Sequence, residues 1–250
     1  MLQRWWRSST APPLARLPIR AAARTHVGRV RTVNEDRLLD RSDRGLWAVA
    51  DGMGGHSAGA AAATMAITVL AALADRDAAV SRADLVRAIE DANAAIYAGS
   101  GDEAGTSGTT IVAVVLDGGR ATICWAGDSR AYRIRAGVAV QLTHDHSLVQ
   151  ELVDAGVLSA SAAERHPRAN VVTRALGVAA QVRIDVIDTG LLPGDRVMLC
   201  SDGISRSLDQ RDFTTMPGDT EAAADRLLAN ALQRDGSDNA TLVLIDIAAA

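Results

Sequence analysis

The chain has 250 residues, 48% of them hydrophobic, and a formal net charge of -4. This length and apolar content predict one large domain with a substantial core, and the mild, dispersed acidity disfavours nucleic acid and anionic membrane surfaces as partners. All 26 basic residues are arginines, which excludes a P-loop lysine, a Schiff base and a lysine general base.

The first 17 residues predict an irregular leader, because they combine Trp5 and Trp6 with the prolines Pro12 and Pro13. They lack the continuous apolar stretch of a secretory signal. No later stretch has the uncharged apolar length of a membrane span, and the nearest one, residues 57–74, is rich in alanine and predicts a buried helix. We therefore expect a domain at residues 18–250 and no membrane segment.

Short apolar runs with β character alternate with three helical segments after the leader. The expected helices cover residues 57–74, 82–97 (with Ser81 as a capping residue) and 219–233. The expected strands lie in residues 19–25, 45–51, 109–117, 121–127, 129–135, 182–188, 195–201 and 240–247. Strands in runs with inserted helices favour an α+β layered fold over a βαβ wind.

Residues 147–170 interrupt this pattern. They are helical and polar in patches and lie between two groups of strands. Such an excursion over the surface is a place for a substrate-contacting flap, and an ordinary surface subdomain is the equal alternative. We call residues 147–170 the flap segment below.

Aspartates recur at the ends of the apolar runs. Asp51 follows LWAVA, Asp128 follows CWAG, Asp202 follows VMLCS, and Asp238 precedes NATLVLIDI. A single Asp-Gly after a strand indicates only a turn. Four such carboxylates at the mouths of buried strands require protons or cations if the strands share one pair of sheets. Oxygen-only ligands select hard ions such as Mg²⁺ or Mn²⁺.

A pair of such ions activates a bound water as a nucleophile for in-line attack on a phosphate ester. A nearby arginine would neutralise the non-bridging phosphate oxygens with bidentate geometry. The carboxylate pattern thus predicts metal-assisted hydrolysis of a phosphate ester.

Eight motifs, in order, resemble those of the metal-dependent type 2C protein phosphatases, in particular their bacterial members. The similarity covers about residues 18–248. The motifs are GRVRTVNEDR (28–37), VADGMGGH (49–56), GTT (108–110), AGDSRAYRIR (126–135), LTHDHSLVQELVDAG (142–156), HPRANVVTRALG (166–177), LCSDG (199–203) and SDNATLVLI (237–245).

The resemblance implies a role for each matching residue. Asp51 would bridge two Mn²⁺ or Mg²⁺ ions, and Gly52 would offer its backbone carbonyl to one of them. Asp202 and Asp238 would complete the ligands of the other ion. Asp36 would hold metal-bound waters, and Arg31 would bind the substrate phosphate. Asp128 would help to hold a third, weaker ion.

The implied fold is a sandwich of two antiparallel sheets flanked by helices, with the metals at one end. The implied reaction is direct hydrolysis of phosphoserine or phosphothreonine in proteins, without a phosphoenzyme. The implied partners are phosphorylated proteins, including a serine/threonine kinase encoded nearby and its substrates. The cysteines Cys124 and Cys200 lie in apolar runs without disulfide or zinc spacing, which favours a reducing cytoplasm.

Two positions call for a separate interpretation. Many members of the family have an aspartate four residues after the one matching Asp202, where this chain has Arg206. We therefore expect that Arg206 weakens binding of a third ion or points outward into a salt bridge. His56 is a candidate general acid for the leaving alcohol, and packing within the glycine loop is its alternative role.

Two other functions remain as alternatives. Cys200 and Arg206 have the C-x5-R spacing of a cysteine-dependent phosphatase, but Asp202 within that loop would repel both phosphate and thiolate. A non-catalytic module that binds phosphoproteins is the second alternative, which the complete set of aspartates disfavours. For Thr109, Asp145 and Arg174 we expect structural roles, namely a buried hydroxyl, a turn acceptor and an ion pair.

Overall fold

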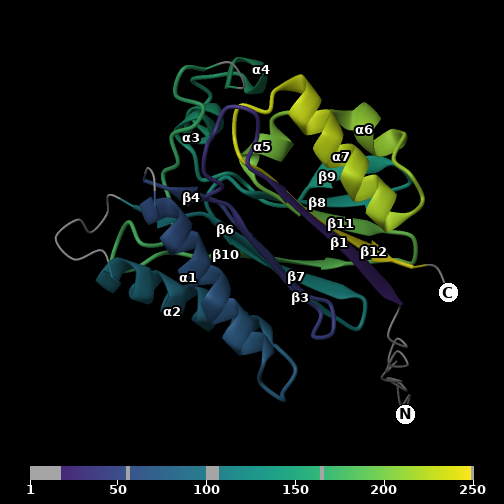
Figure 1. Ribbon diagram of the computed structural model, residues 1–250, viewed down its shortest axis with the longest axis horizontal. Helices are drawn as coiled ribbons and strands as arrows, with labels where there is room; N and C mark the ends of the chain where they lie inside the picture. Colours follow the sequence, from purple (N-terminus) through teal and green to yellow (C-terminus); the bar gives the residue numbers. More distant parts are fainter. Residues whose placement is uncertain (1–17, 55–56, 100–106, 164–165, 249–250) are drawn as a thin grey trace, which may run out of the picture.

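The computed structural model describes residues 18–54, 57–99, 107–163 and 166–248. Two five-stranded antiparallel sheets pack face to face, and helices cover their outer faces (Figure 1). This arrangement confirms the α+β sandwich expected from the sequence. No helix among the described residues is both long enough and apolar enough to cross a membrane.

The first sheet joins the two ends of the described chain. Its strands, in spatial order, are β1 (Ile19–His26), β12 (Ala240–Ile247), β11 (Arg196–Cys200), β8 (Arg130–Arg135) and β9 (Val138–Gln141). Ile19 pairs with Ile247 and His26 with Ala240. The register therefore brings the end of β1 beside the start of β12, where Asp238 lies.

The second sheet is built around strands that are buried along most of their length. Its order is β10 (Asp185–Gly190), β7 (Arg120–Ala126), β6 (Ile111–Asp117), β3 (Leu46–Ala50) and β2 (Arg37–Arg41). A short pair, β4 (Gly52–Met53) and β5 (Gly108–Thr109), continues from one end of it. Arg37 pairs with Ala50, so Asp36 and Asp51 leave the sheet at the same end.

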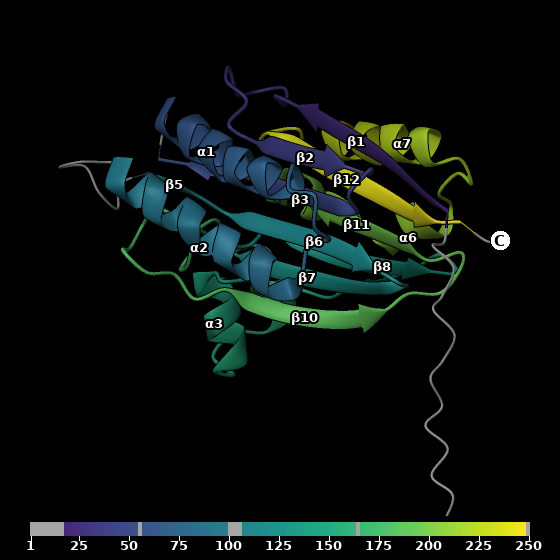
Figure 2. The same cartoon turned by 90° about the horizontal axis from the view of Figure 1, so that it is seen from below.

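Helices form the outer layers of the sandwich (Figure 2). The long helices α1 (Ser57–Ala74) and α2 (Arg82–Gly99) pack on the second sheet. Ser81 and Asp84 form reciprocal hydrogen bonds at the start of α2, as a capping box does. The first sheet is covered by α5 (Asp202–Ser205), α6 (Gln210–Thr214) and α7 (Thr220–Arg234), while the flap segment contributes α3 (Leu148–Asp154) and α4 (Ala160–Ala163).

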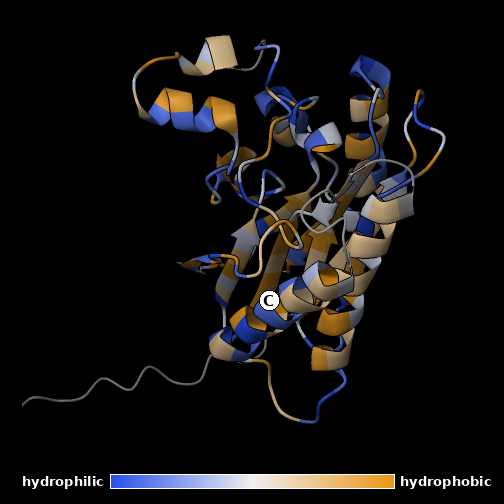
Figure 3. Ribbon diagram, turned by 90° about the vertical axis from the view of Figure 1, so that its left-hand side faces the viewer, coloured by the Kyte–Doolittle hydropathy of each residue, from blue (hydrophilic) through white to orange (hydrophobic). Residues whose placement is uncertain are grey.

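The core has three apolar layers, which explains why the central strands are apolar on both faces. Trp47 and Val49 of β3 point into the layer between the sheets, whereas Leu46, Ala48 and Ala50 face α1 and α2. Side chains of a strand alternate between its two faces, so a strand covered on both sides has no polar face. Figure 3 shows this concentration of hydrophobic residues along the inner strands.

Three parts of the fold differ from the expectation. The strand expected at residues 182–188 begins only at Asp185, and Val182 and Ile184 pack against the α1–α2 layer from a loop. The edge strands β2 and β9 and the short helices α5 and α6 were not expected. The leader expected at residues 1–17 lies outside the described residues.

Candidate metal and phosphate site

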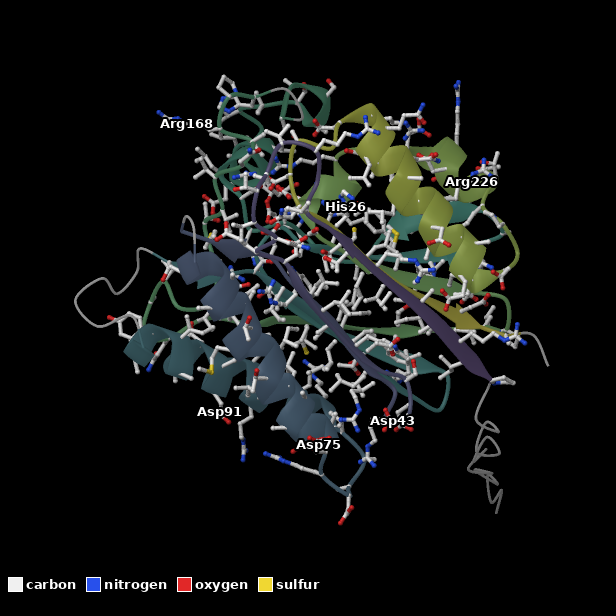
Figure 4. All side chains as sticks on the ribbon, viewed as in Figure 1. His26, Asp43, Asp75, Asp91, Arg168 and Arg226 are labelled. Atoms are coloured by element: carbon white, nitrogen blue, oxygen red, sulfur yellow. The ribbon has the colours of Figure 1, made fainter. Side chains whose placement is uncertain are left out.

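Five aspartates lie at one end of the sandwich, each at the end of a strand. Asp51 follows β3, Asp128 follows β7, Asp202 follows β11, Asp36 precedes β2, and Asp238 precedes β12. Because the strands are antiparallel, the ends of some strands meet the starts of others at the same edge. Figure 4 shows His26, the last residue of β1, near this end, with Asp43 and Asp75 at the opposite end.

The aspartates interact strongly enough to change one another's ionisation. Removal from water raises the pKa of Asp51 well above its ordinary value, and the charges of the other four aspartates raise it further. Burial likewise raises the pKa of Asp36 to about 6 and of Asp128 to about 7, with Asp202 adding to both shifts. Carboxylates in such a cluster require protons or cations as counter-charges.

Within the part of the chain that the structure describes, two buried carboxylate oxygens have no hydrogen-bond partner. Asp36 is 2% exposed, and its Oδ2 accepts a hydrogen bond of 2.8 Å from the Ser201 hydroxyl, but its Oδ1 is unpaired. Oε1 of Glu35 is also buried without a partner. Buried acceptors left unpaired are costly, so these oxygens fit a site for a cation or its bound waters.

The described residues do not hold a closed metal cage, since no three His, Cys, Asp or Glu side chains among them converge as ligands. Hard ions such as Mg²⁺ usually take one or two carboxylates and keep several waters. The dispersed aspartates and the unpaired oxygens match that open coordination better than a site built for zinc. The donor set therefore fits hard divalent ions.

Gly52 lies where only a glycine fits. A Cβ atom at this position would lie 2.3 Å from the carbonyl oxygen of Gly59 and 2.8 Å from that of Glu35. A Cβ atom at Gly59, in the first turns of α1, would in turn lie 2.8 Å from the carbonyl carbon of Gly52. The two glycines let β4 pass between α1 and the loop before β2, which holds the backbone of Asp51 and Gly52 in the cluster.

Threonines fix the backbone of Asp51. Thr109 is fully buried and donates its hydroxyl to the Asp51 carbonyl at 3.0 Å. Thr110 accepts a hydrogen bond of 3.1 Å from the Asp51 N–H through its side chain and donates its own N–H to the Asp51 carbonyl. These contacts leave the Asp51 carboxylate free to face the cluster.

Arg31 is the half-exposed guanidinium beside the aspartates. It lies in the loop between β1 and β2, residues 27–36, which we call the arginine loop. Its Nη2 is 2.9 Å from Oδ2 of Asp238. The Asn239 side chain holds this loop by donating to the carbonyls of Val27 and Val33 at 2.9 Å and accepting from the Glu35 N–H at 2.8 Å. Asn239, the residue after the candidate metal ligand Asp238, therefore positions the loop that carries Arg31, the candidate phosphate-binding residue.

Asp128 is 5% exposed and has Arg206 as its ionic neighbour. Nη2 of Arg206 lies 3.4 Å from Oδ2 of Asp128 and 3.2 Å from Oδ2 of Asp202. The expectation that Arg206 points outward into a salt bridge is wrong: its ion pairs point inward, because the buried carboxylates of Asp128 and Asp202 attract the guanidinium. His56, the candidate general acid, lies outside the described residues.

The three residues expected to have structural roles lie near the cluster. Thr109 is the buried hydroxyl described above. Asp145 accepts hydrogen bonds from the Arg130 guanidinium, one of 2.7 Å, in a buried ion pair and not as a turn acceptor. Arg174 pairs with Asp185 at 3.1 Å, beside the buried ring of His146.

Cys200 lacks the properties of a catalytic nucleophile. It is fully buried within β11, and burial raises the pKa of its thiol to about 12. A reactive cysteine needs the opposite shift and an electropositive, accessible setting. Arg206, the partner that a cysteine-dependent phosphatase would require, contacts Asp128 and Asp202 instead. The geometry therefore opposes the cysteine-dependent alternative.

Sequence reasoning did not identify several residues that build the site. Ser201 holds Asp36 although 165 residues separate them, and Asn239 reaches residues more than 200 positions away. The one indication in the sequence was their position: Ser201 and Asn239 are polar residues directly next to the strand-end aspartates Asp202 and Asp238. Gly59 had no signal beyond a glycine within a helix, where glycine is unfavourable.

Comparison with known proteins places the chain in a family. Residues 25–239 match the Protein phosphatase 2C family. The serine/threonine phosphatase stp of Listeria welshimeri is 34% identical over 239 residues, which cover 90% of this chain and 95% of that protein.

Two solved structures share the fold. The crystal structure of the Mycobacterium tuberculosis serine/threonine phosphatase PstP/Ppp has a TM-score of 0.85 and 36% identity, covering 92% of this chain and 99% of that chain. The catalytic domain of PstP in complex with 2 manganese ions has a TM-score of 0.83 and 35% identity, with the same coverage. The family match, the overall structure and the strand-end aspartates agree, and the chain belongs to the protein phosphatase 2C family.

Proposed function

We propose that this chain is a metal-dependent protein serine/threonine phosphatase. The observation that carries the proposal is the cluster of five interacting aspartates with unpaired oxygens on Asp36 and Glu35, beside the exposed guanidinium of Arg31. The bacterial serine/threonine phosphatases with which the chain aligns over nine-tenths of its length support the same activity.

The proposed ions are Mn²⁺ or Mg²⁺. A related catalytic domain is a complex with 2 manganese ions, and the oxygen-only donor set here suits either metal. When bound, such ions supply Lewis acidity and an activated water. Asp51 and the Gly52 carbonyl would hold ions at the centre of the cluster, with Asp202 and Asp238 as the outer ligands and Asp36 orienting bound water.

Arg31 would bind the substrate phosphate. Its guanidinium is paired with Asp238 in the protein alone, and a metal ion at Asp238 would compete for that carboxylate. A phosphate dianion is then the natural partner, because a guanidinium matches two of its oxygens at once. His56 remains a candidate to protonate the leaving serine or threonine oxygen. A third ion at Asp128, as the family resemblance implies, would have to compete with Arg206 for that carboxylate.

The expected substrates are phosphorylated proteins. A cognate serine/threonine kinase and its substrates are the proposed partners, on the family resemblance alone. We propose a phosphatase domain at residues 18–250 after a leader at residues 1–17, with residues 147–170 as a flap over the site. Two free, buried cysteines support a cytoplasmic location.

Hydrolysis of a phosphothreonine peptide tests the proposal, with Mn²⁺, with Mg²⁺ and with excess EDTA. Activity should require a divalent ion and should fall by roughly 10² or more in Asp51→Asn. The Arg31→Ala variant should retain metal dependence but show a higher KM for the peptide. Tight peptide binding without hydrolysis under any metal would favour a non-catalytic phosphoprotein-binding module instead.

A further inference from the structure

Arg206 lies between the aspartate cluster and the flap segment. It caps the C-terminal end of α5, four residues after Asp202. One nitrogen of its guanidinium contacts Asp128 and Asp202 at the distances given above, and its side chain is 33% exposed. One protein cation therefore serves two carboxylates of the cluster.

The same guanidinium also holds the flap segment. Nη1 donates to the side-chain oxygen of Asn170, and Nη2 donates to the carbonyl of Ala169 at 3.0 Å. A planar fork with five donors is suited to such simultaneous contacts, whereas a lysine ammonium is not. Residues 169–170 are thus tied to the same atoms that neutralise Asp128 and Asp202.

We propose that Arg206 is a fixed cation of the site and a positioning residue for the flap. It stands where an ion bound by both Asp128 and Asp202 would lie, and it holds residues 169–170 at the edge of the cluster. A divalent ion in this gap would have to displace the guanidinium from both carboxylates and from the flap. The native protein therefore binds no divalent ion between Asp128 and Asp202, an inference that rests on the proposed metal-dependent function.

The electrostatics of Asp128 agree with this role. Burial and the charge of Asp202 raise the pKa of the Asp128 carboxyl, and the charge of Arg206 lowers it. Without Arg206, the two carboxylates would lack their nearest counter-charge and would need another cation. An ordinary structural ion pair would affect stability alone, whereas the proposed role also fixes how many ions bind.

Counting bound Mn²⁺ by equilibrium dialysis tests the first part of the proposal. Arg206→Gln removes the charge at similar length, and Arg206→Lys keeps the charge without the fork. The Gln variant should bind one more, weaker ion than the wild type, while the Lys variant should not. The additional ion should disappear again when Asp128→Asn is combined with Arg206→Gln.

A second variant keeps the test decisive if Arg206→Gln does not fold. In a chain with Arg206 intact, Asp128→Asn should leave the number of bound Mn²⁺ ions unchanged, because Asp128 is engaged by Arg206. Loss of one ion in Asp128→Asn would overturn the proposal. An unchanged ion count in folded Arg206→Gln would do the same.

Trypsin cleavage after Arg168 tests the second part. Arg168 is exposed and lies next to the residues that Arg206 holds, while Arg226 lies across the molecule on α7 (Figure 4). Followed by mass spectrometry, cleavage at Arg168 should be roughly tenfold faster in Arg206→Gln than in the wild type. It should be unchanged in the matched control Arg226→Gln. Equal rates in the two Gln variants would refute the flap contact.

Both measurements are independent of catalysis. If the protein hydrolyses no phosphopeptide but the ion count and the cleavage rate change as expected, the proposed function fails and the role of Arg206 stands. If hydrolysis is normal but neither the ion count nor the cleavage rate changes, the proposed function stands and the role of Arg206 fails.

Discussion

Asn239 gives the most specific prediction about how the site is held. Its side chain is 7% exposed and makes three hydrogen bonds to the arginine loop, to Val27, Val33 and Glu35. Asn239→Ala would remove two donors and one acceptor at once. At about 1 kcal/mol for each hydrogen bond, the free energy of unfolding should fall by about 3 kcal/mol. For a domain of this size, that is a decrease of roughly 6 to 12 °C in Tm.

The kinetic effect should separate this residue from an ordinary buried asparagine. A looser arginine loop places Arg31 less well, so KM for a phosphothreonine peptide should rise by roughly tenfold. Asn230→Ala is the matched control, since among the described residues the Asn230 side chain makes one hydrogen bond, of 2.8 Å, to Asp212 on the helical layer. In that variant the free energy of unfolding should fall by about 1 kcal/mol, and KM should equal that of the wild type.

Thermal unfolding followed by circular dichroism and steady-state kinetics check both effects. Asn239→Asp adds a further comparison, because it keeps the acceptor for Glu35 and loses the donors for the two carbonyls. Its stability near neutral pH should be no higher than that of the alanine variant, because the new carboxylate would face two carbonyl oxygens beside the aspartate cluster. The reasoning is refuted if Asn239→Ala is no less stable than Asn230→Ala and has the wild-type KM.

Three further predictions concern the carboxylates and the thiol. The pKa values of Asp36 and Asp128 are raised in the folded protein, to about 6 and about 7, so the metal-free protein should lose stability as pH rises through that range. Melting in EDTA from about pH 5 to about pH 8 should show a falling Tm that Mn²⁺ abolishes, and a flat Tm would contradict this. Asp202→Asn should raise the metal-free Tm at about pH 8 by relieving repulsion, and should reduce stabilisation by Mn²⁺; a lower metal-free Tm at this pH would count against it. The buried thiol of Cys200 should resist iodoacetamide in the folded protein, and Cys200→Ser should keep wild-type kcat, whereas rapid alkylation would show that β11 opens.

The central strands were predictable because their sequences carry a strong and local signal. The run LWAVA of β3 is apolar throughout, as a strand buried on both faces must be. The edge strands lack that signal. In β2 only Leu39 is buried, and β9 has no buried residue, so neither pattern distinguishes a strand from a loop. Their pairing is decided by neighbours distant in sequence.

The site was predictable where chemistry follows strand ends. Four aspartates were identified from their positions beside apolar runs, and the structure brings them into electrostatic contact. They are Asp51, Asp128, Asp202 and Asp238. The residues that hold them were not identifiable in this way. Ser201 and Asn239 act across more than 160 positions, and no local pattern indicates such a contact.

The contacts of Arg206 could not be predicted from the sequence either. Its replacement of an acidic residue suggested either a weaker third-ion site or a salt bridge directed outward, and the sequence offered no means to choose. In the structure the salt bridge is directed inward, to both Asp128 and Asp202. It adds the contacts to Ala169 and Asn170, which the sequence did not indicate.

One measurement tests directly whether hydrolysis depends on a metal held by the aspartates. It is the initial rate of phosphothreonine peptide hydrolysis as Mn²⁺ is titrated into wild type, Asp202→Asn and Cys200→Ser. We expect no hydrolysis without metal, saturable activation in wild type and Cys200→Ser, and a rate lower by roughly 10² or more in Asp202→Asn. Hydrolysis that persists in EDTA and disappears in Cys200→Ser would contradict this expectation.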